Sequence, residues 1–233
     1  MNNIFDKPEG QNEAGFNSAS AKTSGMGSNL IICVGRQLGS GGCEIARMLA
    51  KEFDCNFYDS ELINMAAERS GFSPSIFKTQ DESHGVLKSI LDGFSGRLGR
   101  MSENFYDNSI SQESLFQIQS EAIFKAAKEE NCVFVGRCAD YILRRHEKLF
   151  SVFITANDDE RRKVVANRMG CDENVAAKYI AKKERQRADY YNYYTSKKWG
   201  AAESYDMCIN SSLLGWERTA ALIAQVIRST FNA

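Results

Sequence analysis

The chain has 233 residues and a formal net charge of −1, from 29 lysine and arginine and 30 aspartate and glutamate side chains. Its hydrophobic fraction of 43% and charged fraction of 25% are ordinary for a globular protein, and its length allows one large domain or two small ones. The near-neutral charge argues against partners such as nucleic acid or an anionic membrane, and no stretch approaches the ~20 apolar residues of a membrane span.

Residues 1–28 are rich in Asn, Gly, Ser, Ala and Lys and show no hydrophobic period, which predicts a disordered tail ahead of a single domain over 29–233. The cysteines are odd in number and form no C-x-x-C pair: Cys33, Cys43, Cys55, Cys132, Cys138, Cys171 and Cys208. This usage favours a reducing compartment over a disulfide framework, and we therefore expect a cytoplasmic protein.

Short apolar strands and helices alternate from residue 30 onward. The apolar runs predict buried strands over residues 30–34, 56–58, 132–135, 149–154 and 207–209. The helical patterns predict helices over about 44–53, 60–70, 111–130, 158–169, 172–188 and 215–230, a helical insertion over 71–110 and a Tyr-rich segment over 190–200. This alternation indicates a parallel sheet covered on both faces, in which ligands bind at the carboxyl ends of the strands.

A Gly-rich segment, Gly35 to Gly42 (GRQLGSGG), lies between the first strand and the first helix. Glycines there allow a tight turn whose N–H groups point at an anion, aided by the positive end of the helix dipole. Against the phosphate-loop consensus G-x-x-x-x-G-K-S/T, Gly42 stands at the lysine position and Glu44 near the magnesium-binding hydroxyl. Our hypothesis is that Arg36 supplies the missing cation. The alternative is a strand–helix turn without a ligand.

Two further segments follow predicted strands and carry polar side chains. In VGRCAD, Arg137 would bind a phosphate bidentately and Asp140 would accept a hydrogen bond from a base or a ribose; the alternative is a surface salt bridge with a helix cap. In FYDSE, Asp59 and Ser60 would read a second nucleotide or orient its phosphate, or one of them would cap the following helix. Both segments supply candidate acceptor-binding residues.

The two helices predicted between 158 and 188 are basic. Their cations are Arg161, Arg162, Lys163, Arg168, Lys182, Lys183, Arg185 and Arg187. Such runs are commonly solvated faces, but phosphoryl transfer needs cations that converge on the phosphate, often from a closing lid. The tyrosines that follow would either stack on a base or pack the lid against the domain: Tyr190, Tyr191, Tyr193 and Tyr194.

Together these segments resemble the cytidylate kinase-like family of P-loop proteins. The resemblance runs from Leu30 to about Ile227, over the ordered motifs GRQLGSGGCEIARMLA, FYDSELI, VFVGRCADYIL, ERRKVVANRMG, ERQRADYYNYYTSKKWG and YDMCIN. It implies a P-loop NTPase-type three-layer α/β/α fold with a five-stranded parallel sheet, a helical monophosphate-binding insertion over about 60–120 and a lid over about 170–200. It also implies ATP as phosphoryl donor, Mg²⁺, and small-molecule nucleotide substrates.

The resemblance and the segments above divide the expected site residues into three groups. The ATP-binding group is Gly39, Ser40, Gly41, Gly42, Arg161 and Arg168. The catalytic group is Arg36, Arg137, Arg185 and Arg187. The group that binds the nucleoside monophosphate is Asp59, Ser60, Arg137 and Asp140. No metal ligand and no oligomeric state are assigned.

The sequence therefore predicts an ATP-dependent kinase for a nucleoside monophosphate, with CMP or dCMP as first choice. Ordinary cytidylate kinases carry an Asp directly after the Gly-Arg pair and a Tyr-Arg pair after the Ser, where this chain has Cys138 and Asn64-Met65. Two alternatives stay open: a kinase for another small acceptor, and a nucleotide-binding regulator that does not catalyse.

Overall fold

The structure is a computed structural model that describes residues 29–59, 63 and 112–232. Its described strands form a five-stranded sheet, all parallel, in the order β2-β3-β1-β4-β5. They are β1 (Ile31–Arg36), β2 (Asn56–Tyr58), β3 (Cys132–Val135), β4 (Leu149–Thr155) and β5 (Met207–Asn210). The predicted tail, the insertion over 71–110 and all but residue 63 of the helix expected over 60–70 lie outside the described residues.

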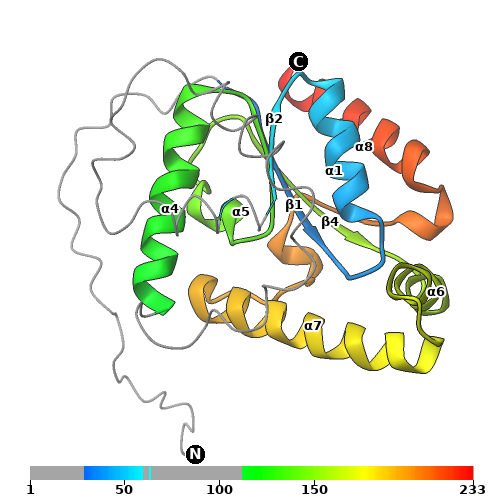
Figure 1. The fold of residues 1–233 in the computed structure, drawn as a ribbon. Helices are drawn as coiled ribbons and strands as arrows, with labels where there is room; N and C mark the ends of the chain where they lie inside the picture. Colours follow the sequence, from blue (N-terminus) through cyan, green and yellow to red (C-terminus); the bar gives the residue numbers. More distant parts are fainter. Residues whose placement is uncertain (1–28, 60–62, 64–111, 233) are drawn as a thin grey trace, which may run out of the picture.

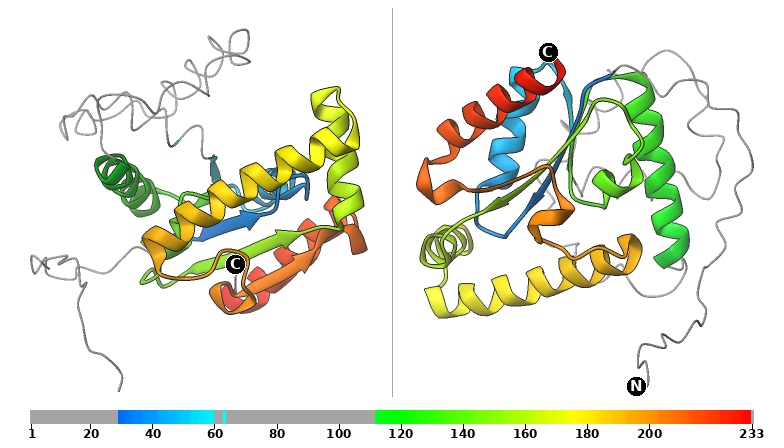
Figure 2. Two further views of the ribbon diagram at one scale, coloured as in Figure 1. Left: turned by 90° about the horizontal axis from the view of Figure 1, so that it is seen from below. Right: turned by 180° about the vertical axis from the view of Figure 1, so that it is seen from behind.

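Helices cover both faces of the sheet, as Figure 1 shows. One face carries α1 (Gly42–Glu52) and α8 (Trp216–Phe231), and the other carries α4 (Gln112–Glu129) and α5 (Ala139–Ile142). The remaining helices, α6 (Asp158–Met169) and α7 (Glu173–Thr195), pack against each other, and seen from below α7 crosses in front of the strands (Figure 2). Two short 3-10 helices, Ala202–Ser204 and Ser211–Leu213, flank β5. The expected three-layer α/β/α architecture is confirmed.

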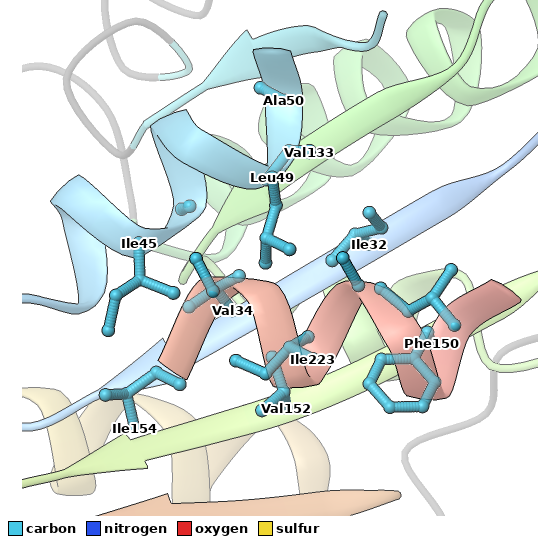
Figure 3. Packing of buried hydrophobic residues seen from close by; sticks show 14 of the residues in the cluster. Ile32, Val34, Ile45, Leu49, Ala50, Val133, Phe150, Val152, Ile154 and Ile223 are labelled. Atoms are coloured by element: carbon cyan, nitrogen blue, oxygen red, sulfur yellow. The ribbon is translucent and has the colours of Figure 1, made fainter. Parts of the chain in front are cut away.

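Two apolar cores hold these layers together, because successive side chains of a strand point to opposite faces. Ile32 and Val34 of β1 meet Leu49 of α1 and Ile223 of α8 on one face (Figure 3). On the other face Phe134, 1% exposed, belongs to a cluster with α4 and α5 and stacks on Tyr58 with ring centroids 5.3 Å apart. No helix in the described ranges is long and apolar enough to cross a membrane.

The element predictions hold best where the pattern is local. The strands over 56–58 and 132–135 and the helix over 158–169 agree with the structure at both ends. The prediction that the next helix gives way to a separate Tyr-rich segment near residue 188 is wrong, since α7 continues to Thr195. The reason is tertiary: these tyrosines are helical because α4 and α5 offer them partners.

The contacts of the tyrosines favour packing of α7 against the domain over stacking on a base. Tyr190 OH donates to Gln119 Oε1 at 2.9 Å, and Tyr194 stacks on Phe116 with ring centroids 4.0 Å apart. Tyr191, 5% exposed, belongs to the core beneath α7. Tyr190, Tyr191 and Tyr194 are therefore used within the protein, whereas Tyr193 is 70% exposed.

Candidate phosphate-binding site

The loop between β1 and α1 presents an uncapped helix N-terminus. α1 begins at Gly42 after Gly41, which has a left-handed φ of 73° and provides no side-chain cap. The first N–H groups of a helix have no partner inside it, so those of α1 suit an external acceptor at the positive end of the dipole. Ser40 is used within the fold: its Oγ donates to the Gln37 carbonyl at 2.9 Å, and its own carbonyl accepts from Ser211 Oγ at 2.7 Å. The Ser40 contacts hold the loop to the rest of the fold. The N–H groups of the first turn of α1 remain for an external acceptor.

Arg36, the last residue of β1, runs beside this loop. A Cβ atom on Gly42 would lie 2.5 Å from Arg36 Cβ, and a Cβ atom on Gly136 would lie 2.5 Å from Arg36 Nη1. The side chain therefore extends from the position of the consensus lysine to the turn after β3. It fits because glycines stand at both places.

The two strands that Arg36 bridges are adjacent, but their connections leave on opposite faces of the sheet. β1 continues into α1 on one face, and β3 continues into α5 on the other. In open α/β sheets, ligands bind in the crevice at such a switch point, outside the carboxyl ends of the strands. Arg36 thus lies at the expected ligand position.

Arg137 lies on the strained turn after β3. Three consecutive residues have left-handed φ values: Gly136 at 81°, Arg137 at 53° and Cys138 at 56°. Such backbone costs roughly 1–2 kcal/mol for a non-glycine residue and concentrates at functional sites. The Arg137 guanidinium lies 5.2 Å from the centroid of the Tyr190 ring, and its Nε is buried without a hydrogen-bond partner. An unpaired buried donor is costly, so this side chain is suited to accept an anion.

Arg187 of α7 brings a third guanidinium to the same place, where its Nη1 donates to the Arg36 carbonyl oxygen at 3.2 Å. Desolvation and the like charge of Arg187 lower the pKa of Arg36 to about 9, and Arg137 adds to the repulsion. Burial also lowers the pKa of Arg187. We call Arg36, Arg137 and Arg187 the arginine cluster. Because like charges gather there in half-buried positions, a bound anion would stabilise the cluster.

Two of the other predicted cations form ion pairs with carboxylates. Arg161, 7% exposed, donates to Glu184 at 2.6 Å and to Asp158 at 3.1 Å. Arg168 pairs with Glu44 of the first turn of α1 at 3.0 Å. Both arginines flank the phosphate loop, but protein groups hold their guanidinium groups. Their contact with ATP stays a prediction.

Arg185 and Asp59 lie in different surroundings. The Arg185 side chain is 85% exposed and its Nε lies 3.9 Å from Asp189, so the structure does not bring it to the arginine cluster. Asp59, at the end of β2, pairs with Arg47 at 3.5 Å, and its charge acts on the pKa of Arg36. Asp59 is therefore near the cluster. Ser60 lies outside the described residues.

Asp140 is half-buried beside α7. One carboxylate oxygen accepts from Tyr191 OH at 2.7 Å. Desolvation raises the pKa of Asp140, against the opposing effects of the Tyr191 hydrogen bond and the Lys197 charge. Among the described residues, no ion pair joins Asp140 to Arg137, so the surface salt bridge weighed for the two is not found.

Asp140→Asn is expected to raise the free energy of unfolding at pH 7, with a gain that shrinks as the pH falls towards about 4. The folded-state pKa lies above the unfolded one, so the native state holds the proton more readily and the ionised form destabilises the fold at neutral pH. Asparagine keeps an acceptor for Tyr191 without the charge. Urea unfolding at several pH values measures this. A stability loss at neutral pH would show that the hydrogen bond to Tyr191 requires the carboxylate.

Sequence reasoning missed Gly136 and Glu184 in this region, and it named Tyr191 for base stacking or lid packing but not as the partner of Asp140. Gly136 precedes Arg137 in the VGRCAD motif. A glycine at that position could have indicated that another group lies close to the backbone there. Glu184 has no local signal, because it is one carboxylate in a charged helix and its partner Leu38 is 146 positions away. The partner of Asp140 depends on the same long-range packing.

The structure gives less support for a metal site than for an anion site at the loop between β1 and α1. No group of three His, Cys, Asp or Glu that could hold a metal ion occurs in the part of the chain that the structure describes. Magnesium at kinase sites is usually held by one or two carboxylates together with substrate phosphates and water. Asp59, directly after β2, is a carboxylate of this kind, and it pairs with Arg47 at 3.5 Å.

Comparison with known proteins bears on the fold and the family. No curated protein matches the chain. A solved structure of an uncharacterized protein from Eubacterium ventriosum is 27% identical, with a TM-score of 0.66 over 86% of this chain and 99% of that one. Shikimate kinases from Bacteroides thetaiotaomicron and from Acinetobacter baumannii, the latter with shikimate bound, are 12% and 13% identical, both with a TM-score of 0.47. The match covers 88% of this chain and 99% of the Bacteroides enzyme, and 87% of this chain and 95% of the Acinetobacter enzyme. This likeness is too low to argue from.

A family model described as the cytidylate kinase-like family matches residues 31–213. That range holds the phosphate loop, all three arginines of the cluster and the whole sheet. The chain has the P-loop NTPase-type α/β fold and belongs to the cytidylate kinase-like family.

Proposed function

We propose that this protein is an ATP-dependent kinase that phosphorylates an anionic small molecule, with the nucleoside monophosphates CMP and dCMP as the first candidates. The observation that carries the proposal is the arginine cluster beside an uncapped helix N-terminus. Donor and acceptor phosphates are the kind of ligand that such an arrangement stabilises. Family membership supports phosphotransfer as the reaction.

Each part of the site has a role in this proposal. The N–H groups of Gly39 to Gly42 and of the first turn of α1 would hold the donor phosphates. Arg36 would meet the transferring phosphoryl group, and Arg137 would clamp the acceptor, because a guanidinium binds phosphate oxygens bidentately. Phosphoryl transfer asks the protein for positioning and charge stabilisation more than for covalent chemistry. A bound magnesium ion would neutralise charge on the donor phosphates, and Asp59, which pairs with Arg47, would be the carboxylate to hold it.

A second candidate keeps the fold and the donor but changes the acceptor. Asp140 accepts a hydrogen bond from Tyr191 OH in a half-buried position, and Cys138 stands directly after Arg137. Recognition of cytosine would need a carboxylate directly after Arg137. Neither Cys138 nor Asp140 supplies one there. These observations favour an anionic acceptor other than a cytidine nucleotide as the runner-up.

The test is ATP consumption by the purified protein with Mg²⁺ and each of CMP, dCMP, UMP, AMP and GMP. Turnover with CMP or dCMP well above the others is the expected result. Turnover with none of the five, with ATP binding intact, would contradict a nucleotide acceptor. It would favour either another anionic acceptor or a nucleotide-binding regulator, and ATP consumption with a broader set of phosphate and carboxylate acceptors would separate these two.

The cysteine thiols support a proposal about the compartment in which the protein works. All seven cysteines are free, and burial raises the pKa of the Cys33 and Cys138 thiols. Free thiols support the proposal that the protein works in a reducing, cytoplasmic compartment. The proposed partners are its small-molecule nucleotides.

A further inference from the structure

Two side chains on one face of α7 hold the backbone from which Arg36 emerges. Glu184 and Arg187 are three residues apart and so lie one above the other on the helix. Leu38 N–H donates to Glu184 Oε1 at 3.1 Å, and Arg187 Nη1 donates to the Arg36 carbonyl oxygen at 3.2 Å. Glu184 thus binds the N–H of Leu38, and Arg187 binds the C=O of Arg36, two residues earlier in the loop. We call these two contacts the α7 clamp.

The carboxylate of the clamp is itself fixed in place. Glu184 Oε1 also accepts from Arg161 Nη1 at 2.6 Å, and the two side chains are only 19% and 9% exposed. A charge-assisted bond in such surroundings is strong and directional. Arg161 also balances the charge of Glu184, so a carboxylate can lie beside a loop that is suited to phosphate.

Apolar and backbone packing add to the same docking. Leu38 packs against the small core between α6 and α7, which contains Val165 and Ile180. A Cβ atom on Gly39 would lie 2.7 Å from the Arg161 carbonyl oxygen, so the loop backbone runs directly against α6. Residues 36–39 are therefore held by α6 and α7 together.

We propose that Glu184 is a positioning residue that aligns Arg36 for phosphoryl transfer through the α7 clamp. This inference rests on the proposed function. The Arg36 side chain starts at the clamped backbone and ends beside Gly136, so a shift of the loop moves its guanidinium relative to the phosphoryl group. Misplacement by about 1 Å in such a site costs up to about 100-fold in rate. Glu184 acts on kcat and touches neither substrate.

The first test is a double-mutant cycle with Arg36. Glu184→Ala is expected to lower kcat about 10- to 100-fold and to leave the KM for ATP within about threefold. Glu184→Gln keeps a carbonyl acceptor for Leu38 N–H and is expected to recover most of the loss. In an Arg36→Ala background, Glu184→Ala is expected to lower kcat no further, because both changes act through one group. Equal losses in the two backgrounds would overturn the proposal.

The matched control is Asp189→Ala, which removes a carboxylate from the same helix at a side chain that is 73% exposed. It is expected to leave kcat unchanged. Thermal unfolding of every variant separates a misfolded protein from a misaligned one.

The second test reads the contact without turnover. In the ligand-free protein, Glu184→Ala is expected to speed hydrogen exchange of the Leu38 amide at least about 10-fold, and Asp189→Ala is not. Unchanged exchange in Glu184→Ala would overturn the clamp. If the wild-type protein phosphorylates no acceptor, the proposed function fails and the role in catalysis fails with it. Leu38 exchange in that case still decides whether the clamp exists.

Discussion

Arg36→Ala is expected to lower kcat about 100- to 1000-fold for the acceptor that the protein phosphorylates best, with little change in thermal stability. Removal of one fixed donor from a developing charge costs about this much in other enzymes. Arg36 replaces the consensus lysine in space, since its side chain passes Gly42 on the way to Gly136. Steady-state kinetics with saturating ATP measure the effect. A loss confined to the KM for ATP would assign Arg36 to ground-state binding.

Restoring the consensus lysine is the sharper part of this prediction. Gly42→Lys alone is expected to lower kcat, because its Cβ atom would lie 2.5 Å from Arg36 Cβ. Combined with Arg36→Gly, which removes that Cβ, the same lysine is expected to recover at least about 10-fold over Arg36→Gly alone, since a cation returns to the loop. An increase in kcat from Gly42→Lys in the wild type would show that Arg36 does not occupy the lysine's place.

The sheet could be predicted from the sequence because its signal is local. The Cys132–Val135 run is continuous and apolar, as expected of a strand buried on both faces. The glycines between Gly35 and Gly42 likewise mark the turn between β1 and α1 by composition alone. These features need only neighbours in the chain.

The arrangement of charges could be predicted only in part. Arg36, Arg137 and Arg187 were all identified as candidates, and the structure brings them together because β1 and β3 are adjacent and α7 crosses their ends. Arg185 was grouped with them by composition, but it is two residues from Arg187 on a helix and so faces another direction. The rotation of α7 about its own axis decides which arginine faces the loop. A run of charged residues in the sequence does not indicate that rotation.

The pairing of Arg161 with Glu184 was beyond sequence reasoning for a related reason. The two residues lie on different helices, and their bond depends on how α6 and α7 pack. An arginine that the sequence assigned to ATP is thus held by a carboxylate that the sequence did not single out. The same carboxylate links the loop to α7, because it also accepts a hydrogen bond from Leu38 N–H at 3.1 Å.

Arg137→Gly is expected to raise the free energy of unfolding by up to about 1 kcal/mol while lowering kcat/KM for the acceptor about 100- to 1000-fold. Glycine adopts the φ of 53° at this position without strain and removes a buried Nε that has no partner. The same change deletes the guanidinium that would clamp the acceptor. Urea unfolding and acceptor titration measure the two effects separately.

Ser196→Gly is the matched control, because Ser196 is exposed at the end of α7 and has a φ of 54°. It is expected to stabilise the fold by a similar amount and to leave kcat/KM unchanged. Opposite signs for stability and activity in Arg137→Gly alone would show that the strained turn after β3 is maintained for binding and not for folding. If stability and activity instead fall together, Arg137 holds the turn, and the acceptor must be bound by other residues.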